Sequence, residues 1–277
     1  MIRHSPAKVN LFLKVLGKRE DGYHDIATLM QRISLCDEMD ISLRSRDIRV
    51  RCPGTSLPED EGNIVYRAAR LFLLRARSGQ GVDITLRKKI PIEAGLGGGS
   101  SNAATTLLAL NGLLGTPFGD GELMKMGAEI GADVPFFIFG RTAWAFGIGD
   151  RLEAADEVPK MWFVLLNPGF GLSTKRVYES LNLGLTKEAI RFSIQTFLTA
   201  GDVAKGLHND LETAAAGMHP LILELKKTLM EHGALGSLMS GSGATVFGLF
   251  ADEQDALRAG EALKKAGKWS VFTAHSL

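Results

Sequence analysis

The stretch Pro91-Ile-Glu-Ala-Gly-Leu-Gly-Gly-Gly-Ser-Ser-Asn-Ala-Ala104 decides the fold of this chain. Four of the five residues Gly95–Gly99 are glycines, which free the backbone to adopt positive φ and let N–H groups converge on one point. Ser100 and Ser101 follow, and then an apolar helical pattern begins. A helix that opens there adds unpaired N–H groups and the positive end of its dipole. The stretch therefore predicts a phosphate-binding loop, and the strand-like run before it (82–90) argues against the alternative of a flexible surface loop.

The loop does not match the three common glycine motifs. A Walker motif requires Gly-Lys-Ser or Gly-Lys-Thr, and no lysine lies between Gly95 and Asn102. The dinucleotide fingerprint fails because Ser100 stands where it needs Gly or Ala. Ser100, Ser101 and Ser242 all lack the paired glycines of a nucleophile elbow. With no lysine in the loop, the charge of a triphosphate must be compensated by Mg²⁺, by the helix dipole and by residues elsewhere.

The composition is that of an ordinary globular protein of 277 residues, with 45% apolar residues and a net charge of +1. This balance predicts neither a nucleic-acid partner nor a membrane partner, and we interpret the cluster Arg87-Lys88-Lys89 as a solvated strand end. Cys36 and Cys52 have no metal or redox spacing, which favours a reducing compartment. The segment Met1–Lys8 lacks the apolar core of a signal peptide. We expect a cytoplasmic protein, and a homodimer is compatible with the sequence.

The apolar residues follow strand-like and helical periods in both halves of the chain. Strands are expected over 8–15, 39–43, 48–51, 82–88, 142–146, 161–166, 237–239, 245–250 and 269–273. Helices are expected over 63–77, 101–114, 120–130, 220–233 and 252–264. The acidic stretch 153–160 marks the expected boundary between an N-terminal domain (1–155) and a C-terminal domain (156–277). Because strict βα alternation is missing, the fold class is α+β with two domains.

Two segments place polar residues where chemistry would use them. Lys8 and Asn10 alternate on a predicted strand, so their side chains project to the same face, which in the alternative interpretation is simply solvated. The second segment, Gly131-Ala-Asp133-Val-Pro135, places an aspartate after a helix end and before an X-Pro unit that favours extended backbone. The alternative for Asp133 is a turn-forming residue without a chemical role.

Two segments near the C-terminus complete the set. Met239-Ser-Gly241-Ser-Gly243-Ala-Thr245 is a second loop of small residues, and its alternative is a tight turn where two backbones pass closely. His208-Asn209-Asp210-Leu-Glu212 has the alternative of plain helix capping by Asn209 or Asp210. Each segment alone is ambiguous, so their combination and order decide the interpretation.

In combination these segments resemble the GHMP kinase superfamily, whose signatures are an N-terminal strand, a glycine-serine loop and a C-terminal glycine loop. All three occur here in that order and cover the chain from end to end. The resemblance implies an N-terminal domain like domain 2 of ribosomal protein S5 and a ferredoxin-like C-terminal domain, with the active site between them. It also implies a left-handed βαβ crossover, against the usual handedness of such units.

The resemblance implies an ATP-dependent kinase that phosphorylates the tertiary 2-hydroxyl of a methylerythritol tethered to cytidine diphosphate, with Mg²⁺ as cofactor. Asp133 is then the base that accepts the proton of the alcohol, and Lys8 keeps that carboxylate ionised and stabilises charge on the transferred group. The metal ligands are left undetermined, and Ser100 and Ser101 both stay candidates. ATP binding falls to the loop residues Pro91, Ile92, Glu93, Ala94, Gly95, Leu96, Gly97, Gly98, Gly99, Ser100 and Ser101.

The same resemblance assigns the cytidine end of the substrate to Asn10, Tyr23, His24, Thr174 and Tyr178. His24 and Asn10 read the pyrimidine edge, while Tyr23 and Tyr178 stack on the base. The alternative for Tyr178 is a buried aromatic of the following helix. Two other functions stay open: another small-molecule GHMP kinase, such as a mevalonate or homoserine kinase, and an inactive member that binds nucleotide for regulation.

Overall fold

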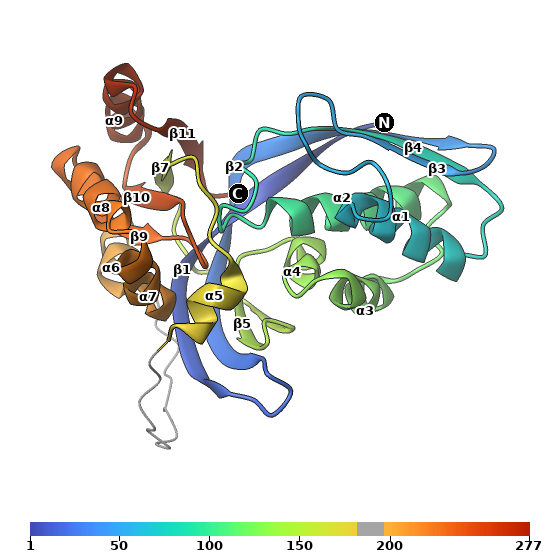
Figure 1. Ribbon diagram of the computed structural model, residues 1–277, viewed down its shortest axis with the longest axis horizontal. Coiled ribbons are helices and arrows are strands. Elements are labelled where there is room, and N and C mark those ends of the chain that lie inside the picture. Colours follow the sequence, from blue (N-terminus) through green and yellow to red (C-terminus); the bar gives the residue numbers. More distant parts are fainter. Residues whose placement is uncertain (182–196) are drawn as a thin grey trace. The chain divides into compact units, whose positions relative to one another are not determined.

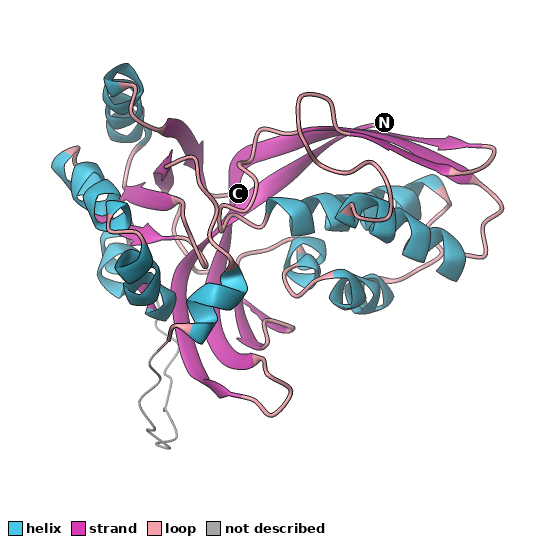
Figure 2. Ribbon diagram, in the orientation of Figure 1, coloured by secondary structure: helices cyan, strands magenta, loops and turns pink. Residues whose placement is uncertain are grey.

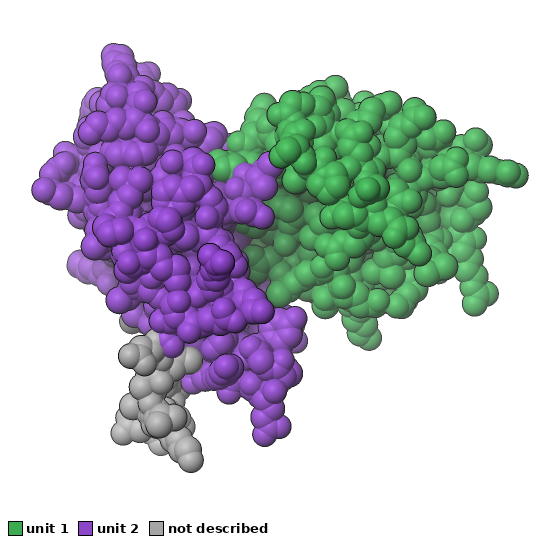
Figure 3. Space-filling view, in the orientation of Figure 1, with its two compact units in different colours: residues 1–7, 36–91, 97–141 green, residues 8–35, 92–96, 142–277 purple. Residues whose placement is uncertain are grey.

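The computed structural model describes residues 1–181 and 197–277 (Figure 1). The chain forms two compact units, each built from three separate segments (Figure 3). Unit 1 consists of Met1–Ala7, Cys36–Pro91 and Gly97–Arg141, and unit 2 consists of Lys8–Leu35, Ile92–Leu96 and Thr142–Leu277. Two long strands, β1 (Ile2–Lys18) and β2 (His24–Arg44), contribute residues to both units.

Unit 1 combines strands with a group of four helices (Figure 2). Its part of β2 pairs antiparallel with β4 (Gly81–Arg87), and β4 pairs parallel with β3 (Ile48–Arg51). The helices are α1 (Ile64–Arg75), α2 (Gly98–Leu113), α3 (Asp120–Ile130) and α4 (Val134–Phe139), and they pack against one another. Phe72 of α1 and Phe136 of α4 are fully buried, so the core of this unit lies among the helices and against the strands.

Local signals define where these helices begin. The Asn63 side chain accepts a hydrogen bond from the Val65 N–H at 2.9 Å and caps α1. The Glu122 carboxylate accepts from the Gly119 N–H at 3.0 Å and so satisfies one backbone donor at the start of α3. Helix α2 starts after Gly97, which has a left-handed φ of 67°.

Unit 2 contains an antiparallel sheet in the order β11-β7-β10-β9, with α8 and α9 packed against it. The elements are β7 (Trp162–Asn167), β9 (Gly236–Met239), β10 (Val246–Phe250), β11 (Ser270–His275), α8 (Leu221–Glu231) and α9 (Glu253–Ala266). Leu225 and Leu229 of α8 join Leu263 of α9 and Val164 of β7 in one buried apolar cluster. The sheet therefore carries its helical layer on one face, as expected for an α+β domain.

The remaining strands of unit 2 extend the parts of β1 and β2 that belong to this unit. Strand β5 (Ala143–Gly147) pairs with both β2 and β6 (Arg151–Ala154), and β8 (His208–Asn209) pairs parallel with β1. Three short helices complete the described part of the unit: α5 (Thr174–Glu179), α6 (Ala200–Gly206) and α7 (Asp210–Met218).

Two local expectations differ from the structure. The unit Val134-Pro135 is the start of α4 rather than extended backbone, because Pro is tolerated in the first turn, where its missing N–H has no partner to lose. Lys88 is not solvated: its side chain is only 7% exposed, because an aspartate pairs with it. Within the described ranges, no helix combines the length and apolar character needed to cross a bilayer.

Candidate active site

The second half of the glycine loop forms the N-terminal turn of α2 in unit 1. Ser101 is fully buried, and its Oγ accepts a hydrogen bond from the Ser5 hydroxyl at 2.8 Å. Ser100 is only partly buried, and a Cβ built on Gly131 would lie 3.9 Å from its Oγ. The two serines are therefore not equivalent: Ser101 is hydrogen-bonded in the interior, whereas Ser100 is partly exposed.

The first half of the loop packs against the C-terminal glycine loop within unit 2. The Ser240 hydroxyl donates to the Gly95 carbonyl at 3.0 Å, and the Thr245 N–H donates to the Ala94 carbonyl at 3.3 Å. Gly95 has a φ of +75°, and a Cβ at this position would lie 2.1 Å from the Ser240 carbonyl oxygen. Glycine is therefore required here. The expected close passage of two backbones is confirmed, and the backbone that passes is that of the first glycine loop.

Lys8 and Asn10 do project to one face of β1, but that face is not solvated. Lys8 is 4% exposed and Asn10 is 3% exposed. The Lys8 ammonium donates to Asn10 Oδ1 at 2.5 Å, and Asn10 Nδ2 donates to the Thr28 hydroxyl at 2.8 Å. A Cβ on Gly241 would lie 3.3 Å from Asn10 Oδ1, so the N-terminal strand and the C-terminal glycine loop meet here. The interpretation of a merely solvated face is wrong.

Asn209 links helix capping to this arrangement. Its Oδ1 accepts from the Leu211 N–H at 3.0 Å, which caps α7 and confirms the expected capping role. Its Nδ2 donates to the carbonyls of Met239 and Gly241, both at 2.8 Å. One buried amide therefore fixes the start of a helix and the shape of the C-terminal glycine loop together.

Asp133 lies in unit 1 at the turn that precedes α4. The turn is closed by a hydrogen bond from the Val134 N–H to the Gly131 carbonyl at 3.1 Å. Asp133 is partly buried, whereas Val134 and Pro135 are buried in the core. The packed start of α4 thus holds the backbone of Asp133 in place next to the turn that Ser100 adjoins.

The aromatic residues of unit 2 are arranged differently from the expected tyrosine pair. The His24 and Tyr178 rings stack with centroids 4.9 Å apart and an interplanar angle of 27°, whereas Tyr23 is 61% exposed. Burial, reinforced by the charge of Lys18, lowers the pKa of His24, so its imidazole is neutral at neutral pH. Tyr178 is partly buried against the apolar core of unit 2, and one turn before it the Thr174 hydroxyl lies 2.8 Å from the Ser242 hydroxyl.

Lys88 and Asp37 form a buried ion pair beneath α2 that the sequence interpretation missed. A signal was present, because Lys88 continues the alternation of Val82, Ile84 and Leu86, which all face the core. The alternation therefore predicted a buried side chain, whereas the neighbouring Arg and Lys suggested a solvated cluster. The strand alternation gave the correct prediction for Lys88 because the buried ammonium has an ionic partner, Asp37.

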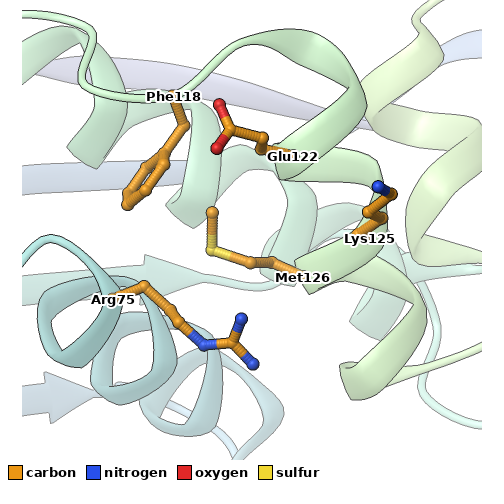
Figure 4. A pocket seen from close by; sticks show the side chains of 5 residues that line it. All are labelled: Arg75, Phe118, Glu122, Lys125 and Met126. Carbon is orange, nitrogen blue, oxygen red and sulfur yellow. The ribbon is translucent and has the colours of Figure 1, made fainter.

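A hollow of about 210 Å³ lies elsewhere in unit 1, beside α1 and α3 (Figure 4). It is lined by Arg75, Phe118, Glu122, Lys125 and Met126. None of the residues predicted to bind ATP or substrate lines it. The Arg75 guanidinium is already engaged by the Glu129 carboxylate at 3.0 Å. The hollow therefore does not compete with the glycine loops as the candidate site.

The chain matches two models of one superfamily. Residues 63–141 match the N-terminal domain of GHMP kinases, and residues 194–268 match their C-terminal domain. A homoserine kinase structure from Cytophaga hutchinsonii shares the fold, with a TM-score of 0.75 and 20% identity over 100% of this chain and 93% of that one. The fold is therefore the two-domain α+β fold of GHMP kinases.

Relatives with higher sequence identity identify the family within the GHMP kinases. A 4-diphosphocytidyl-2-C-methyl-D-erythritol kinase from Syntrophus aciditrophicus is 60% identical over 273 residues, which is 99% of this chain and 98% of that protein. A crystal structure of a 4-(cytidine 5'-diphospho)-2C-methyl-D-erythritol kinase has a TM-score of 0.82 and 36% identity over 100% of this chain and 99% of that one. The chain belongs to the 4-diphosphocytidyl-2-C-methyl-D-erythritol kinase family of GHMP kinases.

Proposed function

We propose that this chain transfers the γ-phosphoryl group of ATP to the 2-hydroxyl of 4-diphosphocytidyl-2-C-methyl-D-erythritol, a step of non-mevalonate isoprenoid biosynthesis. The observation that carries the proposal is the 60% identity, over nearly the whole chain, to a protein of that name. The likeness to a homoserine kinase is one of fold alone, at 20% identity. We further propose a cytoplasmic location, a homodimer and a boundary near residue 155 between the family domains 1–155 and 156–277.

For the ATP end, we propose that residues Pro91–Ser101 surround the phosphates. The left-handed Gly97 and the first turn of α2 support this, because they leave backbone N–H groups directed at one point near the positive end of a helix dipole. Ser100 is the preferred side-chain donor, because Ser101 already accepts a hydrogen bond in the interior. Positioning and charge neutralisation of this kind account for most of the catalysis of phosphoryl transfer.

For the chemical step, we propose Asp133 as the base that accepts the proton of the 2-hydroxyl. Its partial burial and its fixed backbone support the assignment, since a base must be held within reach of the proton it takes. We propose Lys8 as the cation that stabilises charge on the reacting oxygens. Burial and the hydrogen bond to Asn10 hold its ammonium in one place, which preorganises that charge.

Mg²⁺ is compatible with the donors in unit 1. Mg²⁺ takes few protein ligands, typically one or two carboxylates, and fills its octahedron with phosphate and water oxygens. Among the described residues no group of three His, Cys, Asp or Glu side chains gathers at one point, so an all-protein cage is not available there. We propose the Ser100 hydroxyl as the protein oxygen that would hold Mg²⁺ beside the phosphate and water oxygens; the metal supplies neutralisation of phosphate charge when bound.

For the cytidine end, we propose that Tyr23 and Tyr178 hold the base and that His24, Asn10 and Thr174 orient it. The aromatic character of Tyr178 and its contact with His24 support a flat surface for a base on α5. A neutral imidazole offers one donor and one acceptor to a pyrimidine edge, and burial keeps His24 in that form. The exposed Tyr23 ring would become covered when the base binds.

Substrate-dependent ATP consumption tests the proposed function. Purified protein is incubated with ATP, Mg²⁺ and one acceptor at a time: 4-diphosphocytidyl-2-C-methyl-D-erythritol, mevalonate or homoserine. ADP release with the cytidylylated acceptor alone is expected, with phosphorus NMR placing the new phosphate on the 2-hydroxyl. Turnover of mevalonate or homoserine in its place would replace the proposal with the corresponding kinase, and nucleotide binding without any turnover would favour the regulatory alternative.

Gly98→Val is expected to raise the KM for ATP by at least about tenfold, because small displacements of positioning groups have large effects. A Cβ at Gly98 would lie 3.0 Å from Ile90 Cγ2 and 3.1 Å from Lys88 Nζ, so these neighbours or the first turn of α2 must give by a few tenths of an ångström. Gly112→Val is the matched control, because this glycine lies on the same helix outside the loop and a Cβ there would meet nothing within 4 Å. Steady-state kinetics at saturating acceptor give both values, and an unchanged KM in folded Gly98→Val protein would remove this loop from ATP binding.

Alanine at Tyr23 or Tyr178 is expected to weaken CDP binding by about ten- to a hundredfold, since base–aromatic stacking contributes about 1–3 kcal/mol. Phenylalanine at either position should bind CDP almost like tyrosine, because the ring supplies the stacking. Calorimetry with CDP and with ADP separates the two ends of the site, and ADP binding should stay unchanged. Folded alanine variants that bind CDP like the unmodified protein would contradict the clamp and favour a kinase without a cytidine substrate.

A further inference from the structure

A buried polar network lies directly under the N-terminal turn of α2, wholly within unit 1. The Lys88 ammonium donates to Asp37 Oδ2 and, at 3.2 Å, to Asn102 Oδ1. The side chains of Lys88 and Asp37 are 7% and 0% exposed, respectively. Asn102 lies at the start of the second turn of α2. The ion pair is therefore hydrogen-bonded to the helix that follows the glycine loop.

Asp37 also organises the backbone on the other side of the loop. Its Oδ1 accepts from the N–H groups of Lys89 and Ile90 at 2.7 and 2.9 Å, and its Oδ2 also accepts from Asn102 Nδ2 at 2.9 Å. One carboxylate therefore joins the segment that leads into the loop to the helix that leaves it. Because buried charges are retained only when they are paired and hydrogen-bonded, each member constrains the others.

The network continues to the serine of the loop. Asn102 Nδ2 donates to Ser5 Oγ at 2.9 Å, and the Ser5 hydroxyl donates to Ser101 Oγ at 2.8 Å. At the other end, the Lys88 ammonium occupies the space next to Gly98, where an added Cβ would lie 3.1 Å from it. Buried polar side chains therefore contact both the first residue of α2, Gly98, and the fourth, Ser101.

We propose that Lys88 and Asp37 are positioning residues for ATP: together they hold the first turn of α2 so that its N–H groups are preorganised for phosphate. This inference rests on the proposed role of the glycine loop in ATP binding. Neither side chain needs to touch the nucleotide, since both act through Asn102, Ser101 and the backbone. The expected signature is a weaker affinity for nucleotide with little change for the cytidine substrate.

Asp37→Asn separates the positioning role from the competing explanation, in which Lys88 contacts phosphate directly. If Lys88 contacted phosphate directly, Asp37→Asn would release the ammonium and remove a nearby negative charge, so nucleotide binding would tighten. Under the positioning role, Asp37→Asn weakens binding, because an amide cannot accept from the backbone N–H groups and from Lys88 and Asn102 together. Lys88→Met weakens binding in both cases, so the sign for Asp37→Asn is decisive.

The neighbouring pair Arg87 and Glu38 provides matched controls. Glu38 and Arg87 are opposite each other in the β2–β4 ladder, each next in sequence to a member of the buried pair. Their ion pair, at 3.1 Å, is exposed, with side-chain exposures of 53% and 32% for Arg87 and Glu38. Arg87→Met and Glu38→Gln remove the same charges from the same strands without touching α2, and exposed pairs contribute little.

The test measures ADP binding by calorimetry for Lys88→Met, Asp37→Asn, their double variant and the two controls, with thermal melting to confirm folding. Each buried variant is expected to lose about ten- to a hundredfold in ADP affinity. The double variant should lose about as much as the worse single variant, because the pair acts as one unit. In steady-state kinetics, the buried variants should have a raised KM for ATP, while their kcat and their KM for the cytidine substrate stay within a fewfold of the unmodified protein. The two control variants should match the unmodified protein in all of these values.

Unchanged ADP affinity in folded Lys88→Met protein, or tighter binding by Asp37→Asn, overturns the inference. Should either variant fail to fold, Ser101→Ala decides instead: it removes only the hydroxyl that ties α2 to Ser5, and an ADP affinity lower by about three- to tenfold supports the role. Wild-type affinity in Ser101→Ala contradicts it. If Gly98→Val also binds ADP normally, the proposed function of the loop fails; if only that variant loses affinity, the positioning inference fails alone.

Discussion

Asp133→Asn is expected to lower kcat by at least about 10²-fold and to leave the affinity for ATP nearly unchanged. The amide keeps the shape of the side chain at the start of α4, so the fold should be preserved. It cannot accept the proton of the alcohol, so the 2-hydroxyl would have to attack without a base. The loss should therefore fall on turnover and not on binding.

Single-turnover kinetics with saturating ATP and acceptor measure the chemical step for this variant, and calorimetry with ADP measures nucleotide binding. Glu129→Gln on α3 is the control, because that carboxylate is exposed and pairs with Arg75 at the surface of the same unit. Turnover within a fewfold of the unmodified protein would exclude Asp133 as the base.

Lys8→Ala is expected to lower turnover by about 10²–10³-fold, the range for loss of one preorganised electrostatic group. Lys8→Arg should recover less than about a tenth of the activity, since the planar guanidinium is larger than an ammonium and bonds in a different geometry. The Lys8 site is buried and its donor is already directed at Asn10, so the longer fork has little room.

Initial rates for both Lys8 variants, compared at equal fractions of folded protein, check this expectation. Lys227→Ala is the matched control in unit 2, because that lysine is 78% exposed and pairs with Glu231 one turn away on α8. Full activity in Lys8→Arg would show that any positive charge suffices, and the assigned role for the compact ammonium would then be wrong.

The turn of the glycine loop and the helix that follows it were predictable because their signals are local. Glycines that need positive φ, serines and a helical period all lie within a few residues, and α2 begins at Gly98, three residues before the expected start. The pairing of Lys8 with Asn10 was equally predictable, because alternation along a strand places both on one face. Such features depend on neighbours in the sequence and not on the rest of the fold.

Strand β2 was missed over most of its length because its buried polar residues break the alternation. Thr28 and Gln31 are 1% and 2% exposed, which composition alone would not predict. Each is satisfied by a partner distant in the sequence: Asn10 Nδ2 donates to the Thr28 hydroxyl, and the Thr142 hydroxyl donates to Gln31 Oε1. Burial of a polar residue that depends on a partner distant in the sequence can be recognised only once the fold brings the two together.

The aromatic arrangement and the buried ion pair were missed for the same reason. The His24 and Tyr178 rings stack although the two residues lie far apart in the sequence, so no local period relates them. Asp37 and Lys88 are 51 positions apart. Neither relation follows from a local period: His24 and Tyr178 were singled out without their contact, and Asp37 was not singled out at all.

The three-segment construction of each unit has a consequence for synthesis on the ribosome. Every segment of unit 1 has been made once residue 141 is added, whereas unit 2 includes Lys8–Leu35 and needs Thr142–Leu277 to be complete. The Asn10 N–H donates to a serine hydroxyl 230 positions later. Contacts of such long range close slowly. The apolar residues of β1 beyond Ala7, which belong to unit 2, therefore lack their last partners through most of translation. This segment is where a nascent chain would need protection from aggregation.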